Sequence, residues 1–182
     1  DELDDHVKNS LQEYDRVDNM ENYEEMFRAV AFFSFRYGKI DWSESNNEYW
    51  LTQDARLRTD FNITNGYQNK EVMDIRSKSK MKKYYKKAGI PCARYHMVST
   101  MEEGLAFIDE VGYPVIVKPD MGVGAAKTYR LANRKEVKTF YDQKPNIPYI
   151  MEEFISGRII SYDGIMNSKK EIIFDTSHIF PT

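Results

Sequence analysis

The sequence predicts a mixed α/β (α+β) fold, and three observations support this prediction. Helical segments with apolar residues at helical spacing alternate with short strand-like runs along much of the chain. Three strand-like runs then follow one another with short turns between them, which indicates an antiparallel sheet. Hydrophobic residues make up 41% and charged residues 30% of the 182 positions, so the chain has the composition of a globular protein with a buried core.

The N-terminal part, residues 1–77, is predicted to belong to an α/β layer. Asn22 and Glu25 have the spacing of a helix N-cap with a capping box. A strand is predicted at 39–43 and a second helix at 46–61. An α/β layer needs more strands than this segment supplies, so we interpret it as a partial domain.

A lysine-rich helix is predicted next, at 77–89. Four of its residues recur at helical spacing and are expected to face the core: Met81, Tyr84, Tyr85 and Ala88. Gly89 is predicted to end the helix as its C-cap, and Pro91 prevents its continuation. The basic segment 70–87 can be a solvated helix face or a positive wall near an anionic ligand, and the sequence leaves both open.

The remaining elements alternate and then end in strands. Ser99 and Glu102 are predicted to form the capping box of the first helix, and Asn133 to cap the second. The predicted elements are a strand at 92–98, a helix at 99–112, strands at 113–118 and 127–132, a helix at 133–143, and strands at 147–155, 158–166 and 171–180. The last two strands are expected to pair as a hairpin.

Charge and cysteine content narrow the class of protein. The net charge is −3, from 26 basic and 29 acidic residues, which favours neither nucleic acid nor a membrane surface as partner. No run approaches the roughly 18 apolar residues of a membrane span. The single cysteine, Cys92, excludes an intramolecular disulfide and favours a cytoplasmic protein.

The most distinctive stretch is 110–130, "EVGYPVIVKPDMGVGAAKTYR". A buried-looking strand ends on Lys118, and the small-residue segment 121–126 follows. An ammonium group beside glycines, whose backbone N–H groups can approach anionic oxygens closely, suits a phosphate. Neither the P-loop nor the dinucleotide fingerprint is present, so a tight turn and an emerging lysine are the plain alternative.

Four segments in a fixed order resemble the ATP-grasp superfamily. They are "SKSKMKKYYKKAGIP", "GYPVIVKP", "GVGAA" and "YIMEEFISG". The resemblance implies a partial domain at 1–77 that precedes the small antiparallel-sheet lobe of an ATP-grasp domain at 78–182. It also implies that the metal-binding acidic residues and the catalytic arginine lie in a C-terminal half outside this stretch.

The resemblance further implies a nucleotide site. Lys78 and Lys118 would bind the phosphates, and Asp163 is a ribose candidate because Ile159 stands where many family members have a glutamate. The loop expected over the β- and γ-phosphates comprises Gly122, Val123, Gly124 and Ala125. The strand expected to receive adenine contains Glu152, Glu153, Phe154 and Ile155, with at most one of the two glutamates reaching the ligand by its side chain.

By the same resemblance, the expected activity is that of an ATP-dependent carboxylate–amine ligase. It would use Mg²⁺ and an acylphosphate to form an amide or peptide bond, with small-molecule carboxylate and amine substrates and a homodimer as a possible assembly. This stretch alone is not expected to turn over, and no catalytic or metal-binding residue is assigned within it. A bicarbonate-using carboxylase or carbamoyl-phosphate-type enzyme and a non-catalytic binding module are the alternatives.

Three acidic residues near one another, Glu44, Glu48 and Asp54, invite an acid–base interpretation. A solvated helix flank is the favoured account of them.

Overall fold

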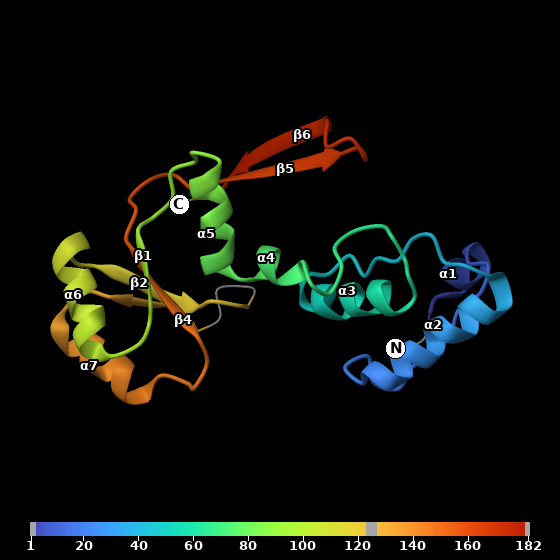
Figure 1. Ribbon diagram of the computed structural model, residues 1–182, viewed down its shortest axis with the longest axis horizontal. Coiled ribbons are helices and arrows are strands. Elements are labelled where there is room, and N and C mark those ends of the chain that lie inside the picture. Colours follow the sequence, from blue (N-terminus) through green and yellow to red (C-terminus); the bar gives the residue numbers. More distant parts are fainter. Residues whose placement is uncertain (1–2, 123–126, 181–182) are drawn as a thin grey trace. The chain divides into compact units, whose positions relative to one another are not determined.

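The computed structural model describes residues 3–122 and 127–180 (Figure 1). Its α-helices are α1 Asp5–Ser10, α2 Tyr23–Tyr37, α3 Leu51–Asp60, α4 Val72–Arg76, α5 Lys78–Lys87, α6 Met101–Val111 and α7 Arg134–Gln143. A 3₁₀ turn, Glu48–Trp50, leads into α3. Its strands are β1 Tyr95–Met97, β2 Val115–Pro119, β3 Tyr129–Leu131, β4 Tyr149–Glu153, β5 Ile160–Met166 and β6 Ile172–Ile179.

Helices and antiparallel strands together confirm the α/β (α+β) prediction. One sheet has the strand order β1-β4-β2-β3, and β5 and β6 form a second, two-stranded sheet. The antiparallel sheet predicted for the last three strands together is therefore wrong, because β4 belongs to the other sheet. In the first sheet, β2 and β3 are antiparallel, with Val115 opposite Leu131. In the second, Ile160 pairs with Ile179, so the predicted hairpin is confirmed.

The chain forms two compact units, which are described separately below. Unit 1 comprises Asp1–Cys92, Lys118–Thr128 and Ile147–Ile150. Unit 2 comprises Ala93–Val117, Tyr129–Asn146 and Met151–Thr182. In the part of the chain that the structure describes, no helix combines the length and apolar character needed to cross a membrane.

In unit 1, Asn22 caps α2 as predicted, but the predicted capping box is wrong, because the Asn22 N–H donates to the Asn19 carbonyl and not to Glu25. The side chain of Asn22 accepts a hydrogen bond from the Glu24 N–H at 3.1 Å. The Glu25 carboxylate accepts the backbone N–H groups of Asp18 and Asn19 at 3.0 and 2.9 Å, which ties the preceding loop to the helix. A carboxylate in the first turn also faces the positive end of the helix dipole.

The strand predicted at 39–43 is wrong, because the structure describes these residues without regular secondary structure. Side chains from farther along the chain bond the backbone here instead. The Ser43 N–H donates to the Asn65 side chain at 3.1 Å, and the Ser43 carbonyl accepts from Arg58. With these backbone groups already bonded, the segment does not need a strand partner.

The orientation predicted for α5 is also wrong for three of its four residues. Tyr84 and Tyr85 are 53% and 41% exposed, Ala88 is exposed too, and Lys82 is buried instead. The predicted C-cap is confirmed, because Gly89 has φ +70° and the Ile90 N–H donates to the Tyr85 carbonyl. This is the bonding pattern of a Schellman motif.

In unit 2, α6 and α7 pack on β-strands to form the core. Its buried apolar residues include Phe107, Ile108, Val115, Val117, Leu131, Val137 and Phe140. The cap of α6 is Thr100 rather than the predicted Ser99, whose hydroxyl donates to the Glu103 carboxylate. Asn133 caps α7 as predicted and accepts from the Glu136 N–H at 3.1 Å.

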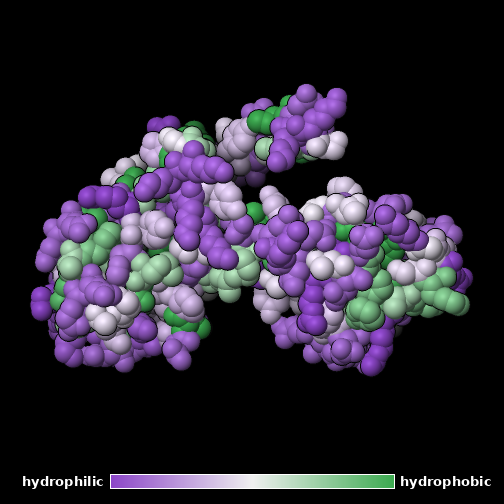
Figure 2. Space-filling model, in the orientation of Figure 1, coloured by the Kyte–Doolittle hydropathy of each residue, from purple (hydrophilic) through white to green (hydrophobic). Residues whose placement is uncertain are grey.

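Apolar side chains are also exposed in both units. Figure 2 shows a mainly hydrophilic surface on the visible face, with an apolar area where α2 lies. Phe35 of α2 is 92% exposed. The hairpin of β5 and β6 exposes large apolar residues along both strands: Ile160, Tyr162, Ile165, Met166, Ile172, Ile173, Phe174 and Ile179.

Candidate functional site

Lys118 lies at the second-last position of β2. Val115, Val117 and Pro119 are buried along this strand, whereas Ile116 and Lys118 are only partly buried. Because side chains alternate across a strand, Lys118 lies on the opposite face from the buried valines. The sequence prediction that an apolar strand ends on this lysine is confirmed.

Asp120 follows two residues later and joins the end of β2 to the start of α5 within unit 1. Its side chain is nearly buried, with 7% of the residue exposed. One carboxylate oxygen accepts the Ser77 hydroxyl at 2.7 Å, and the other accepts the Ser79 N–H at 2.8 Å. The Asp120 N–H in turn donates to the Pro148 carbonyl at 3.0 Å. The carboxylate therefore satisfies a helix N-terminal N–H group that would otherwise lack an intrahelical partner.

Lys78 is the first residue of α5 and lies beside this junction. Its N–H donates to the Asp120 carbonyl at 3.0 Å. Its ammonium group donates to the Gly122 carbonyl at 3.2 Å and lies 3.5 Å from the Asp120 carbonyl oxygen. The structure thus brings the segments that carry Lys78 and Lys118 together, as the sequence predicted for a phosphate site, and Asp120 makes the connection.

Asp120 was not predicted as a residue that positions the site. The sequence does contain the groups that form this contact, since Asp120 follows Lys118-Pro119 and two serines flank Lys78. Gly122 has φ +136°, a backbone conformation that residues with a Cβ rarely adopt. The other predicted loop residues, Val123, Gly124 and Ala125, lie outside the described residues.

The predicted adenine strand corresponds to β4 and the residues after it, in unit 2. Glu152 is buried at 7% exposure. The Glu153 carboxylate accepts the Arg94 N–H and its Nε–H, both at 2.7 Å, and the Glu153 N–H donates to the Arg94 carbonyl at 3.1 Å. The hydrogen bond between the Glu153 carboxylate and the Arg94 side chain raises the pKa of the Arg94 guanidinium. The Glu153 side chain is therefore already bound to Arg94.

Phe154 and Ile155 lie just beyond the end of β4 and are exposed at 45% and 64%. The guanidinium carbon of Arg130 lies 5.5 Å from the centre of the Phe154 ring, within cation–π range. Backbone that has left the sheet while its side chains remain exposed can offer N–H and C=O groups to a planar base.

Asp163 lies in the middle of β5, with 63% of its side chain exposed. The Ser161 hydroxyl donates to the Asp163 carboxylate at 3.3 Å and lies 2.7 Å from Nδ1 of His178. Nδ1 of His178 is 3.6 Å from the same carboxylate. The Ser161 hydroxyl also lies 3.2 Å from Nε2 of His178 and donates directly to the Asp163 carboxylate, so the imidazole does not separate the serine from the carboxylate as in the relay of a nucleophilic serine.

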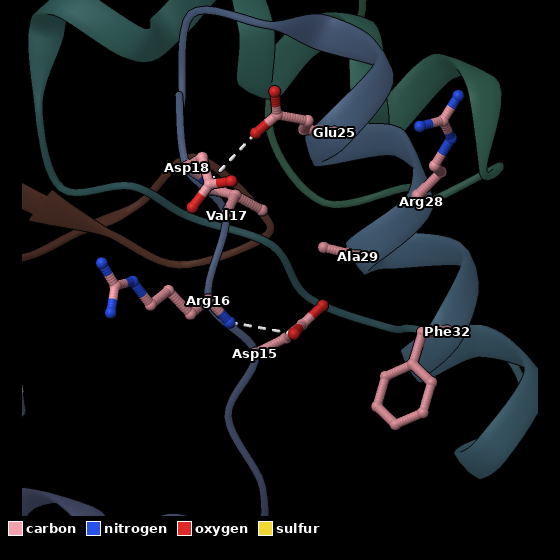
Figure 3. A pocket seen from close by; sticks show the side chains of 8 residues that line it. All are labelled: Asp15, Arg16, Val17, Asp18, Glu25, Arg28, Ala29 and Phe32. Atoms are coloured by element: carbon pink, nitrogen blue, oxygen red, sulfur yellow. Dashed lines mark hydrogen bonds between the residues drawn. The ribbon is translucent and has the colours of Figure 1, made fainter.

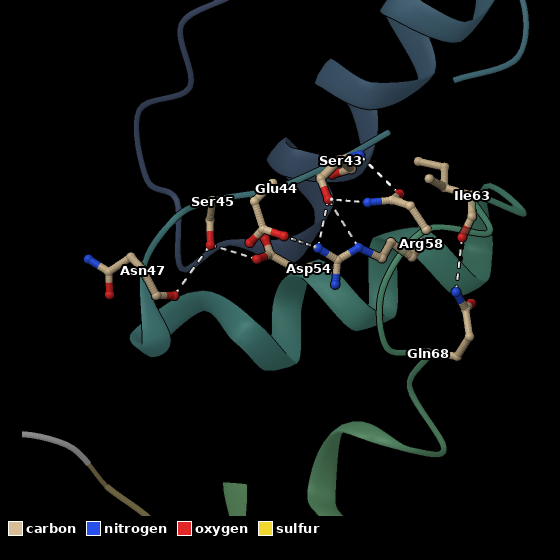
Figure 4. Close-up of polar contacts among 9 residues, drawn as sticks. Ser43, Glu44, Ser45, Asn47, Asp54, Arg58, Ile63 and Gln68 are labelled. Atoms are coloured by element: carbon tan, nitrogen blue, oxygen red, sulfur yellow. Dashed lines mark hydrogen bonds and ion pairs between the residues drawn. The ribbon is translucent and has the colours of Figure 1, made fainter. Parts of the chain in front are cut away.

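Two of the three acidic residues near α3, Glu44 and Asp54, belong to a structural network (Figure 4). Asp54 is buried at 6% exposure and accepts the Ser45 hydroxyl at 2.6 Å, so the solvated-flank interpretation is wrong for this residue. The guanidinium group of Arg58 donates to the Ser43 carbonyl at 2.6 Å and to the Glu44 carboxylate at 3.0 Å. These contacts hold the loop before α3 against the helix. The carboxylates of Glu44 and Asp54 are therefore already hydrogen-bonded.

A hollow in unit 1, of about 380 Å³, lies between residues 15–18 and α2 (Figure 3). Figure 3 shows that the side chains of Arg16 and Arg28 point away from one another. Glu25 at its upper end is bonded to the backbone N–H of Asp18. The hollow therefore lacks a convergent pair of cations for an anionic ligand. Among the described residues, no group of three or more His, Cys, Asp or Glu side chains is placed to hold a metal ion.

Comparison with known proteins agrees with this geometry. Residues 77–146 match the family model described as "Carbamoyl-phosphate synthase L chain, ATP binding domain". The match includes the segments that carry both lysines. A curated relative, the carbamoyl phosphate synthase large chain of Pyrococcus furiosus, is 25% identical over 118 residues, which are 63% of this chain and 11% of the relative.

Solved structures share the fold. The biotin carboxylase domain of the 2-oxoglutarate carboxylase of Hydrogenobacter thermophilus has a TM-score of 0.70 at 19% identity, over 85% of this chain and 38% of that one. An L-amino acid ligase from Bacillus licheniformis has a TM-score of 0.58 at 20% identity, over 87% of this chain and 36% of that one. The chain thus spans well under half of the length of these structures.

The family match over residues 77–146 and the shared fold agree with the resemblance to the ATP-grasp superfamily. Residues 77–146 are similar to an ATP-binding domain.

Proposed function

We propose that this chain supplies the nucleotide-binding part of an ATP-dependent ligase that joins a carboxylate to an amine. The observation that supports the proposal is the junction at Asp120, which joins the chain segments that contain Lys78 and Lys118 inside the matched region. Two ammonium groups on different elements can bracket a triphosphate. In the proposal, residues 1–77 form a partial preceding domain and 78–182 the small ATP-grasp lobe.

In this proposal each site residue has a defined task. Lys78 and Lys118 neutralise phosphate oxygens and stabilise the charge that develops during phosphoryl transfer. A separate role, the exclusion of water from the reacting phosphate, belongs to the loop at Gly122, Val123, Gly124 and Ala125. Adenine stacks against the residues after β4 and bonds to the backbone of Phe154 and Ile155, with Glu152 or Glu153 beside its amino group. Asp163 bonds the ribose.

The complete reaction needs groups that we place outside these 182 residues. Mg²⁺ would neutralise the β- and γ-phosphates, as the MgADP named in the Hydrogenobacter thermophilus structure suggests. Its ligands and a catalytic arginine are proposed to lie in a further part of the protein. A homodimer and a cytoplasmic location, the latter suggested by the single Cys92, complete the proposal.

The test is a calorimetric titration of ATP into the intact protein and its Lys118→Met variant. Loss of a charge-assisted hydrogen bond, about 1.5–3 kcal/mol, should weaken ATP binding roughly 10- to 100-fold. Lys169→Met, in the β5–β6 turn, is the matched control and should bind ATP like the wild type. Equal affinities for wild type and Lys118→Met would contradict the role of Lys118.

A second candidate function uses bicarbonate as the carboxylate. The match to a carbamoyl-phosphate synthase model favours it, whereas the fold shared with the L-amino acid ligase is equally compatible with amide formation. ATP-dependent phosphate release should be measured with bicarbonate alone and with a panel of amino acids. Release with bicarbonate alone would select the second function. ATP binding without phosphate release in either assay would favour a non-catalytic binding module.

A further inference from the structure

A hollow of about 430 Å³ lies along α4 and α5 in unit 1. Its size falls within the range of small-molecule sites. The residues that line it are Tyr67, Glu71, Asp74, Ile75, Met81, Tyr84 and Tyr85. They come from two helices and the loop before them, so the hollow is built by segments that pack together within one unit.

One wall of the hollow is aromatic. Tyr67, Tyr84 and Tyr85 are 50%, 53% and 41% exposed, although two of them have the spacing of a core-facing stripe on α5. Met81 belongs to the same stripe and also lines the hollow. The apolar face of α5 thus contributes to a cavity open to solvent, where aromatic faces and a thioether are available to another molecule.

The polar groups of the hollow are acidic. Glu71 and Asp74 supply two carboxylates, and no lysine or arginine is found among the described residues that line it. Asp74 accepts the hydroxyl of Tyr84, and this hydrogen bond orients the phenol and raises its pKa. Glu71 accepts the Gln68 N–H at 3.0 Å. Each carboxylate retains further acceptor capacity.

The basic residue on the same helical stripe is Lys78, at the start of α5. Its ammonium group is directed to the carbonyls of Asp120 and Gly122, so it does not neutralise the two carboxylates. An anionic ligand would meet like charge in the hollow, and a purely apolar one would desolvate carboxylates without giving them a partner. A cation with an apolar body meets neither cost and gains cation–π attraction from the tyrosine faces.

We propose that the hollow formed by α4 and α5 is a binding site for a small organic cation, an ammonium group carried on an aromatic or aliphatic body. The ammonium group bonds Asp74 and Glu71, and the body lies against Tyr84, Tyr85 and Met81. The inference goes beyond the proposed nucleotide function and does not depend on it.

Three probes of matched shape and different charge test the site in the intact protein: phenethylammonium, 2-phenylethanol and phenylacetate. Binding is followed by calorimetry and by changes in tyrosine fluorescence. Phenethylammonium should bind at least about tenfold more tightly than the neutral alcohol, and phenylacetate more weakly still. Equal binding of the alcohol and the ammonium, or no binding of the ammonium, would overturn the proposal.

Variants locate the binding. Asp74→Asn keeps an acceptor for the Tyr84 hydroxyl but removes the charge. Glu71→Gln likewise keeps an acceptor for the Gln68 N–H and removes the charge, so each should weaken phenethylammonium binding by about three- to tenfold. Tyr85→Leu should cause a loss of similar size while retaining apolar volume.

The matched control is Glu21→Gln, because Glu21 accepts the hydroxyl of Tyr49 at 2.6 Å in the same way but lies outside the hollow. It should bind phenethylammonium like the wild type. Circular dichroism confirms that each variant is folded, and Lys118→Met should leave amine binding unchanged. Wild-type affinity in both Asp74→Asn and Glu71→Gln, or an equal loss in Glu21→Gln, would overturn the proposal.

Discussion

A buried carboxylate, Asp120, holds the two segments that carry the candidate phosphate lysines. It satisfies the Ser77 hydroxyl and the Ser79 N–H, and its own backbone bonds Lys78. Both donors would be left without this acceptor if the carboxylate were removed. The residue therefore couples local stability to the position of Lys78.

We expect Asp120→Ala to lower the free energy of unfolding by about 1–3 kcal/mol, because buried donors lose their partners. Urea denaturation measures this change. Asp142→Ala is the control, since Asp142 is 57% exposed in its ion pair with Lys138 and should change stability by less than about 0.5 kcal/mol. Equal effects of the two substitutions would show that the Asp120 carboxylate has no special structural role.

Arg58 also has a buried charge, at 3% exposure. Its guanidinium group bonds the Ser43 carbonyl and the Glu44 carboxylate. Arg58→Met keeps much of the volume but removes these donors, so we expect a loss of about 2–4 kcal/mol in urea denaturation. Arg28→Met, at an exposed pair with Glu24, should stay close to wild type, and a similarly small effect at Arg58 would contradict this account.

At the scale of elements, α6 and α7 pack through a glycine. A Cβ added at Gly104 of α6 would overlap the hydroxyl oxygen of Tyr141 on α7. That oxygen is buried and has no hydrogen-bond partner among the described residues. The close packing thus requires Gly104, and the tyrosine hydroxyl contributes no compensating bond.

We expect Gly104→Ala to destabilise the protein by about 1–3 kcal/mol. Tyr141→Phe should be neutral or stabilising, because it removes a buried hydroxyl without a partner. In the double variant the loss caused by Gly104→Ala should be smaller, which a double-mutant cycle in urea would measure. Strict additivity of the two substitutions would rule out the contact as the cause.

The raised pKa of Tyr141 makes the free energy of unfolding depend on pH. Burial raises its pKa to about 12, above the value near 10 of an unfolded tyrosine. Between these values the folded state retains a proton that the unfolded state has lost, so stability falls as the pH rises from about 10 to 12. Tyr141→Phe should show a weaker decline over this range in alkaline denaturation, and an unchanged decline would exclude Tyr141 as its source.

At the scale of the whole molecule, the features predicted from sequence were those with local causes. The cap of α2 at Asn22 and the Schellman end of α5 at Gly89 depend on residues within one turn. The failed strand at 39–43 depends on one side chain in α3 and one beyond it, and the contact between Ser77 and Asp120 joins residues 43 positions apart. Periodicity reports that a helix face is apolar, but it does not report whether that face meets a core or a cavity.

The hairpin of β5 and β6 determines much of the exposed apolar surface. Ile165 and Phe174 are cross-strand partners and are 57% and 56% exposed. Exposed apolar patches of this kind bind apolar dyes and promote association. We expect the 182-residue polypeptide to bind 8-anilinonaphthalene-1-sulfonate, and the double substitution Ile165→Thr and Phe174→Thr to reduce the dye fluorescence and self-association.

Threonine retains the preference for strands, so the hairpin should persist in this variant, as circular dichroism can verify. Phe35→Thr on α2 is the control, because Phe35 is 92% exposed but belongs to a different surface. It should change the dye fluorescence less than the hairpin substitutions do. If the dye fluorescence of the hairpin variant equals that of the wild type, the hairpin of β5 and β6 is not the surface that binds the dye.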